Sequence, residues 1–283
     1  MSLTVPESFS EGFGEDGADW LARLPALTAS CLAAWDLTVD GPAMHGACAI
    51  VLPVRRAGGE PAVLKVTWPH DEAEHEALAL SIWDGAGAVR LLAHDPEAWA
   101  LLLERLDPAV TLESEPLHEA LAVLAGMIRR LDRPGPPGVR HMRDVAARWV
   151  HELPVENATG LVPDELLAQA VAYCRELGPR AGDHLVNEDL HFQNVLRGER
   201  EPWLVIDPKP IVGDREYGLT TLLWNRFDAT SVRGRLATVV DLAGLDHDLA
   251  RRWTFTRVVD NWLFAGEGSW LADRCARIAV ELA

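Results

Sequence analysis

One stretch of the chain constrains its fold more than any other: residues 185–196, followed by the apolar run 203–206. Apolar segments lie on both sides of a polar turn, which carries Asp189 and, five residues later, Asn194. The second run, rich in β-branched residues, leads to Asp207. This pattern predicts two carboxylates and one amide at one end of paired strands. The spacing is typical of a phosphotransferase catalytic loop, in which one Asp lies beside the attacking hydroxyl while the Asn and the second Asp hold Mg²⁺.

A purely structural interpretation of the same stretch stays open for each residue taken singly. Asp and Asn are frequent in hairpin turns, and Asp207-Pro208 is also a common way to end a strand. The three polar residues together, with short apolar segments on both sides, favour a metal–phosphate site.

The composition is that of an ordinary globular protein, large enough for two closely associated lobes. It has 283 residues, of which 48% are apolar and 24% charged. A net charge of −17 argues against a nucleic-acid partner and is compatible with a cationic one. We expect no membrane association, because no apolar run has the length of a span and the N-terminus resembles no signal peptide. The scattered cysteines lack metal-ligand spacing and predict a cytoplasmic protein with reduced thiols.

The first hundred residues predict a small antiparallel sheet with one central helix. Apolar runs separated by turns rich in Gly and Pro indicate its strands. The expected strands are 37–39, 47–54, 62–67, 89–93 and 98–103, and the expected helices of this region are 19–31 and 72–83.

Only two of the 26 basic residues are lysines, Lys65 and Lys209. Lys65 is in the middle of an apolar strand, so it either lies at a sheet edge or faces inward with an anionic partner. The next helix offers Glu72, Glu74 and Glu76, although each taken alone is compatible with an exposed acid. Glu76 is the preferred partner because apolar residues surround it, and Glu72 is the alternative. A strand lysine paired with a helix glutamate holds ATP phosphates in kinase-like folds.

The last strand of this region leads into Glu104–Pro108, an extended segment that is typical of a boundary between lobes. We predict an N-terminal nucleotide-binding lobe over residues 1–105 and a mainly helical lobe, with the catalytic loop and the substrate site, over residues 106–283. Free backbone groups of Glu104 and Leu106 would meet the adenine edge. Apolar periodicity predicts further helices over 116–132, 142–153, 164–177, 217–227, 232–243, 247–265 and 270–282.

Several motifs together resemble a known family. They are Val63-Leu64-Lys65-Val66, Glu74–Leu78, Asp189–Leu196, and Ile206–Pro210 with Val212-Gly213-Asp214. The chain resembles the aminoglycoside phosphotransferase family over residues 35–265, and within it the streptomycin 6-kinase and hydroxyurea phosphotransferase branch. The Asp-Pro-Lys-Pro…Gly-Asp run is specific to this branch, whereas the Asp…Asn…Asp set is shared by the whole superfamily.

The resemblance implies an α+β, two-lobed protein-kinase-like fold and an ATP- and Mg²⁺-dependent O-phosphotransferase. Lys65, held by Glu76, would contact the α- and β-phosphates. Asp189 would accept the proton of the substrate hydroxyl, and Asn194 and Asp207 would bind Mg²⁺. The implied substrate is a small hydroxylated, cationic compound, with a streptomycin-type aminoglycoside as the leading candidate.

The chain departs from this family at Asn187-Glu188, where relatives usually carry His-Gly before the catalytic Asp. The extra carboxylate of Glu188 is expected to face the substrate or solvent. Tryptophans and acids of the C-terminal lobe suit a cationic ligand, and we name Asp260 and Glu267 as further candidate contacts. Core tryptophans and surface acids are the alternative. The role of Lys209 is left open between supporting the Asp207 loop and approaching phosphate.

Three other functions compete with this hypothesis. A metal-dependent hydrolase using Asp189, His191 and His184 would leave the Lys65–Glu76 pair unexplained. A pseudokinase-like binding module would lack a catalytic element, and none is missing. A metabolic kinase of the same fold, acting on a sugar, an amino alcohol or a hydroxyurea-like compound, is the main competitor.

Overall fold

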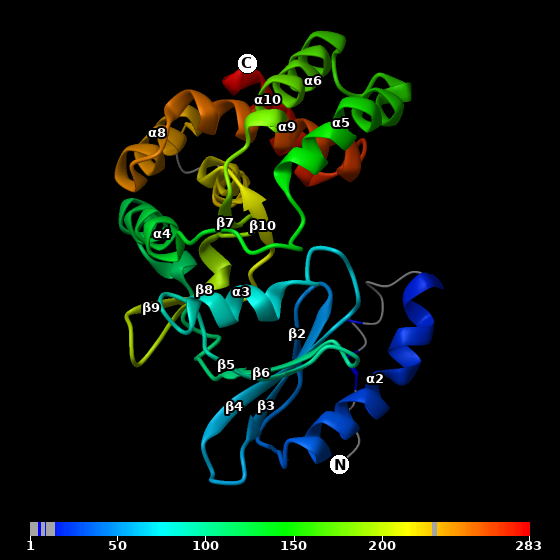
Figure 1. Cartoon of the computed structure of the whole chain (residues 1–283), viewed down its shortest axis with the longest axis vertical. Helices are drawn as coiled ribbons and strands as arrows, with labels where there is room; N and C mark the ends of the chain where they lie inside the picture. The colour runs from blue at the N-terminus through cyan, green and yellow to red at the C-terminus, as the bar shows by residue number, and fades with distance from the viewer. Residues whose placement is uncertain (1–4, 7–8, 10–14, 228–230) are drawn as a thin grey trace. The chain divides into compact units, whose positions relative to one another are not determined.

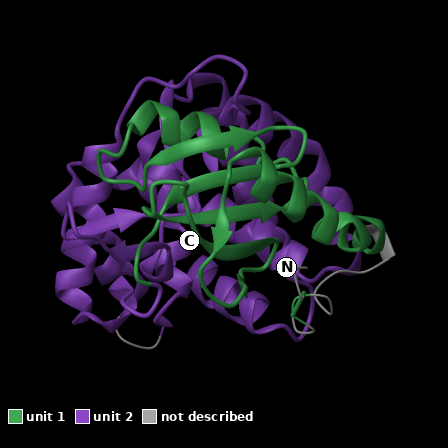
Figure 2. Ribbon diagram, turned by 90° about the horizontal axis from the view of Figure 1, so that it is seen from below, with its two compact units in different colours: residues 1–107 green, residues 108–283 purple. Residues whose placement is uncertain are grey.

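The computed structural model describes residues 5–6, 9, 15–227 and 231–283. The chain divides into two compact units, Met1–Asp107 and Pro108–Ala283, which Figure 2 shows in different colours. No helix in the described ranges is both long and apolar enough to cross a membrane.

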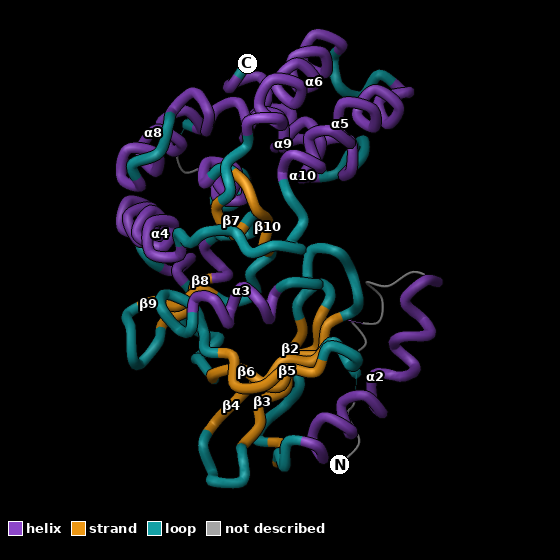
Figure 3. The backbone as a smooth tube through the Cα atoms, viewed as in Figure 1, coloured by secondary structure: helices purple, strands orange, loops and turns teal. Residues whose placement is uncertain are grey.

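The N-terminal unit is built on a six-stranded antiparallel sheet (Figures 1 and 3). The main strand order is β1-β3-β4-β6-β5, and β2 pairs with β3. The five predicted strands are confirmed, each with its ends displaced by at most two residues. The sixth strand, β2, was not predicted, because it is too short to show an alternating pattern. The strands are β1 (Thr38–Val39), β2 (Met44–His45), β3 (Ala49–Arg55), β4 (Pro61–Thr67), β5 (Leu91–Asp95) and β6 (Ala100–Glu104).

One face of this sheet packs against α2 (Glu15–Ala34). Leu64 and Val66 of β4 are fully buried there, in one apolar cluster with Trp20 of α2. Because successive strand side chains point to opposite faces, Lys65 points away from this cluster. The sequence pattern of β4 therefore fixes the direction of the lysine.

The central helix begins later than predicted. α3 spans Glu76–Trp83, and residues 71–75 form turns instead of helix. The reason is visible in the hydrogen bonds, because Ala73 N–H donates to His70 O (3.0 Å) and Glu76 N–H to Ala73 O (3.1 Å). Both bonds span three residues and make tight turns, so Glu76 becomes the first residue of the helix.

The C-terminal unit is mainly helical. Its long helices are α4 (Leu117–Leu131), α5 (Met142–Glu156), α6 (Asp164–Leu177), α8 (Val232–Ala243), α9 (His247–Ala265) and α10 (Trp270–Leu282). All six confirm predicted helices, and four of them, α6, α8, α9 and α10, have the predicted bounds. Short 3₁₀ turns occupy Leu112–Ser114, Asn157–Thr159, Gly178–Arg180, Phe192–Asn194 and Arg215–Leu219.

The helix predicted over residues 217–227 is wrong. This segment ends the 3₁₀ turn at Leu219 and forms only the single-turn helix α7 (Thr221–Trp224). The guanidinium of Arg235, which is 2% exposed, donates to five backbone carbonyls within Leu222–Phe227. Those carbonyls serve the buried arginine instead of a continuing helix.

Two small antiparallel sheets frame the predicted catalytic loop. β7 (His184–Asn187) pairs with β10 (Pro210–Gly213), and β8 (Val195–Arg197) pairs with β9 (Trp203–Val205). The strands on either side of the Asp189 turn thus pair with later strands and not with each other. β10 escaped prediction because a proline and a glycine bound its four residues.

Candidate active site

The N-terminal unit contains the buried ion pair predicted between β4 and α3. Lys65 Nζ lies 2.8 and 2.6 Å from the two carboxylate oxygens of Glu76. The two side chains are only 6% and 3% exposed. A buried ammonium needs such an acceptor, and the alternative partner, Glu72, lies in the turn before the helix. The pair therefore fixes an ammonium on the sheet face opposite α2.

Backbone and side-chain groups of the segment expected to contact adenine, which begins at Glu104, make hydrogen bonds within their own unit. Glu104 N–H donates to Arg90 O (2.9 Å), and the Glu104 carboxylate accepts from Arg90 N–H (3.1 Å). The Glu104 N–H is therefore used within its own unit, and the expected contact of backbone groups of Glu104 and Leu106 with adenine stays a prediction. Leu106 follows as a half-buried residue of the linker. Arg105, between them, donates to Asp40 (2.7 Å), and this bond lowers the pKa of Asp40.

In the C-terminal unit the structure brings the three predicted polar residues to adjoining turns. Asn194 Nδ2 donates to Asp189 O (3.2 Å) and lies 3.4 Å from Asp189 Oδ2. Ile206 N–H donates to Asn194 O (2.9 Å), which brings Asp207, the next residue, beside the same turn. Lys209 Nζ lies 3.6 Å from Asp189 Oδ2. One carboxylate is thus accompanied by an amide, a second carboxylate and an ammonium.

Asn187 holds these two turns together, a role that the sequence did not reveal. Its Oδ1 accepts from Asp189 N–H (3.0 Å) and from Lys209 N–H (3.1 Å). Asp207 adopts a left-handed backbone conformation with φ of 49°. A residue other than glycine rarely does so, and such strain persists where the surroundings fix the backbone. The Asp189 and Asp207 turns therefore form one rigid constellation.

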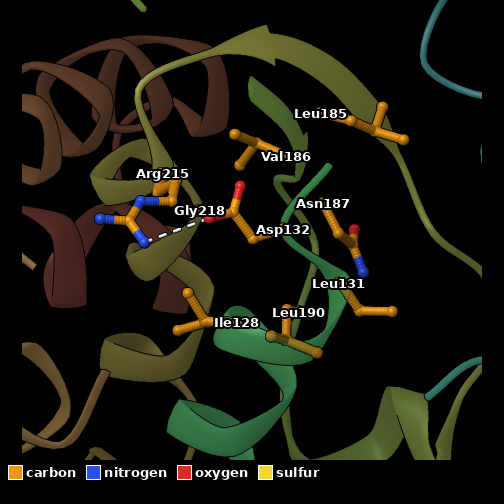
Figure 4. A pocket seen from close by; sticks show the side chains of 9 residues that line it. All are labelled: Ile128, Leu131, Asp132, Leu185, Val186, Asn187, Leu190, Arg215 and Gly218. Atoms are coloured by element: carbon orange, nitrogen blue, oxygen red, sulfur yellow. Dashed lines mark hydrogen bonds and ion pairs between the residues drawn. The ribbon is translucent and has the colours of Figure 1, made fainter. Parts of the chain in front are cut away.

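A small cavity adjoins Asn187 and Leu190 in the C-terminal unit (Figure 4). Its volume is about 30 Å³, and its lining includes Asn187, Gly218 and the ion pair between Asp132 and Arg215, whose atoms lie 3.2 Å apart. Within the described ranges, the buried Nδ2 of Asn187 has no hydrogen-bond partner. The cavity is large enough for a water molecule that could accept from this amide, and too small for a sugar.

The histidines near the loop have local partners. His191 Nε2 lies 3.8 Å from Asp189 Oδ1, and burial lowers the pKa of His191 even though the nearby carboxylates of Asp189 and Asp207 act in the opposite direction. His184 Nδ1 lies 2.7 Å from Asp132 Oδ1. Across the part of the chain that the structure describes, no group of three His, Cys, Asp or Glu side chains is arranged to hold a metal ion. The hydrolase arrangement of Asp189, His191 and His184 is therefore not formed there.

The three candidate substrate contacts lie in different surroundings. Glu188 was expected to face substrate or solvent, but its side chain is 3% exposed and contacts Arg140 and Arg257. The expectation that it faces solvent is wrong, because two guanidinium groups draw this carboxylate into the interior. Asp260 is half-buried on α9, and burial raises its pKa to about 7. Glu267 is exposed in the turn between α9 and α10.

Sequence reasoning missed both arginines that hold Glu188. Arg140 is in an irregular loop before α5 and has no distinguishing local pattern. Arg257 carried a usable signal, because it is a charge within the otherwise uncharged run 253–259 of α9, all of it buried. A charge in such a position predicts a buried anionic partner.

Comparison with known proteins places the chain in a family. The model of the aminoglycoside/hydroxyurea antibiotic resistance kinases matches residues 34–267. A streptomycin 6-kinase from Streptomyces griseus is 41% identical, with 98% of this chain and 94% of the relative covered. A hydroxyurea phosphotransferase from Kitasatospora aureofaciens is 42% identical, with 94% and 80% covered.

A solved structure supports the fold independently. The choline kinase of Streptococcus pneumoniae matches with a TM-score of 0.62 at 11% identity, over 91% of this chain and 97% of that chain. The predicted protein-kinase-like fold is thus confirmed, as is a phosphotransferase that uses a nucleotide and acts on a hydroxyl of a small molecule. The hydrolase hypothesis is wrong. The chain belongs to the aminoglycoside/hydroxyurea antibiotic resistance kinase family.

Proposed function

We propose that the chain transfers the γ-phosphoryl group of ATP, with Mg²⁺, to a hydroxyl of a streptomycin-type aminoglycoside. The observation that carries this proposal is the constellation of Asp189, Asn194 and Asp207, joined through Asn187. The full-length similarity to streptomycin 6-kinases supports the substrate class. We assign nucleotide binding to residues 1–105 and substrate binding to the remainder.

Asp189 is the proposed catalytic base. An ionised carboxylate within reach of the substrate hydroxyl accepts its proton as the oxygen attacks phosphorus. Lys209, 3.6 Å from Asp189, offsets the charge of that carboxylate. Lys65, fixed by Glu76, supplies the ammonium that contacts the α- and β-phosphates. The proposed roles are supported by the contacts that Lys65 makes within the N-terminal unit and that Asp189 makes within the C-terminal unit.

Asn194 and Asp207 fit the proposed Mg²⁺ site. The Nδ2 of Asn194 faces Asp189, which leaves the Oδ1 of the same amide as the candidate ligand. Amide and carboxylate oxygens are donors that Mg²⁺ prefers, with phosphate and water oxygens completing its shell. When bound there, the ion offsets charge on the β- and γ-phosphates.

The substrate side of the proposal rests on α9 and α10. Asp260 and Glu267 provide carboxylates, and Phe264 and Trp270 are large aromatic side chains that are 86% and 60% exposed. Aromatic faces and carboxylates together suit a guanidinium-bearing sugar. Hydroxyurea is the second candidate substrate, supported by the 42% identical hydroxyurea phosphotransferase. The cysteines of the chain, three of them buried, are free thiols, which supports the expected cytoplasmic location.

The test is a coupled assay of ADP release with streptomycin, other aminoglycosides, hydroxyurea and simple sugars as acceptors. We expect Mg²⁺-dependent ADP release with streptomycin and little release with the sugars. Release with hydroxyurea or a metabolite alone would replace the proposed substrate. ADP release that no acceptor stimulates would contradict the proposed transfer.

A further inference from the structure

The catalytic loop carries a buried carboxylate that the proposed chemistry does not use. Glu188 directly precedes Asp189, and its side chain is 3% exposed. Arg140 Nη2 contacts Glu188 Oε1, and Arg257 Nη2 lies 3.7 Å from Glu188 Oε2. Arg257 Nη1 also donates to the backbone oxygen of Glu188 (2.6 Å). Both the side chain and the backbone of this residue are thus held by arginines.

The two arginines are themselves fixed by other elements. Arg140 O accepts from Val212 N–H of β10 (3.0 Å). Arg257 belongs to α9, its side chain is 9% exposed, and its guanidinium carbon lies 5.0 Å from the centre of the Tyr217 ring. Glu188 therefore ties the catalytic loop to β10 and to α9 at once. Asp260, one turn after Arg257, is on the same helix.

Glu188 is linked to the catalytic carboxylate of Asp189 through backbone hydrogen bonds. Glu188 N–H donates to Lys209 O (3.0 Å), and the next N–H, that of Asp189, donates to Asn187 Oδ1 (3.0 Å). A shift of the Glu188 peptide would therefore move Asp189 and the Lys209 turn together. Misplacement of a catalytic group by about 1 Å can cost on the order of a hundredfold in rate.

We propose that Glu188 is a positioning residue, which acts through Arg140 and Arg257 to orient Asp189 and to couple the loop to α9. This inference rests on the proposed function, in which Asp189 is the base. Removing the charge of Glu188 leaves two guanidinium groups near each other without their shared anion, so the loop loses the attraction that holds its backbone.

The test compares Glu188→Gln with the matched control Glu199→Gln, which removes the same charge from an exposed position between β8 and β9. For Glu188→Gln we expect kcat to fall by about 10- to 100-fold, with KM for ATP changed by less than about twofold. We also expect faster amide hydrogen exchange over residues 186–195 in the free protein. The control should match the wild type in all three readouts. Arg257→Lys keeps the positive charge but loses the planar guanidinium group with its two parallel donors. It should reproduce both effects, and it replaces Glu188→Gln if that variant does not fold.

Two results would overturn the inference. Wild-type kcat together with wild-type exchange would mean that Glu188 does not position the loop. An increase in KM for the acceptor alone would return Glu188 to the role of a substrate contact. Hydrogen exchange needs no substrate, so it tests the positioning role even if streptomycin proves not to be phosphorylated, a result that would count against the proposed function alone.

Discussion

Replacing Lys65 by methionine separates the contribution of the Lys65–Glu76 pair to stability from its contribution to catalysis. Both side chains are almost fully buried, and the ammonium makes two short hydrogen bonds to the carboxylate. Removing one partner of such a pair leaves an uncompensated buried charge, which costs about 3–5 kcal/mol. Lys65→Met and Glu76→Leu should therefore each lower the free energy of unfolding of the N-terminal unit by that amount.

The double variant should behave differently. An apolar pair of similar volume often replaces a buried ion pair without loss, so Lys65→Met/Glu76→Leu should regain wild-type stability to within about 1 kcal/mol. It should still lack phosphotransferase activity, because no ammonium is left to contact the phosphates. Stability and activity would then be separated in one protein.

The assay is urea denaturation followed by intrinsic fluorescence, with kcat and KM for ATP measured on the same samples. Arg180→Met is the matched control, since the Arg180–Glu176 pair is 68% and 50% exposed. Loss of an exposed pair costs about 0–1 kcal/mol. A cost below about 1 kcal/mol for Lys65→Met would refute the buried pair. A double variant with wild-type kcat would refute the phosphate contact.

Three further predictions concern the C-terminal unit. Asp207→Asn should raise the Mg²⁺ concentration needed for half-maximal activity by about tenfold, because a charged ligand is lost; an unchanged Mg²⁺ titration would argue against the metal site. Lys209→Met should lower kcat by about tenfold, through loss of a charge–charge interaction at 3.6 Å, and a wild-type kcat would show that Lys209 serves only the loop. Burial raises the pKa of Asp260 to about 7, so folding favours its neutral form and its contribution to stability is lost as pH rises from about 4 to about 7. Asp260→Asn should thus have a free energy of unfolding higher than that of the wild type at pH 8, on the order of 2–4 kcal/mol. Measured by urea denaturation, this difference in free energy should be smaller at pH 5. Equal differences at the two pH values would contradict the raised pKa.

Local signals predicted much of the fold. α6 and α9 begin and end at the residues expected from their apolar periodicity and flanking turn residues. β4 was recognisable because its apolar run continues on both sides of Lys65. The sequence also identified Asp189, Asn194 and Asp207 as one group, since their spacing along the chain reflects the two turns that meet in the structure.

Features that depend on distant contacts could not be predicted in this way. Arg235 belongs to the following helix, α8, and its hydrogen bonds to the backbone carbonyls after α7 end that helix. No pattern within residues 217–227 could therefore predict where the helix is interrupted. Glu188 resembles a surface acid in its own segment. Its burial is decided by Arg140 and Arg257, which contact it in the folded unit although they lie far from it in the chain.

The most direct test of the account is the product formed from streptomycin, ATP and Mg²⁺, identified by mass spectrometry, with the wild type and Asp189→Asn side by side. The account predicts streptomycin carrying a single phosphoryl group with the wild type. With Asp189→Asn it predicts a rate lower by at least about a hundredfold, while ATP still binds. Full activity of Asp189→Asn, or ATP consumption by the wild type without a phosphorylated acceptor, would contradict the assignment of Asp189 as the catalytic base of a hydroxyl kinase.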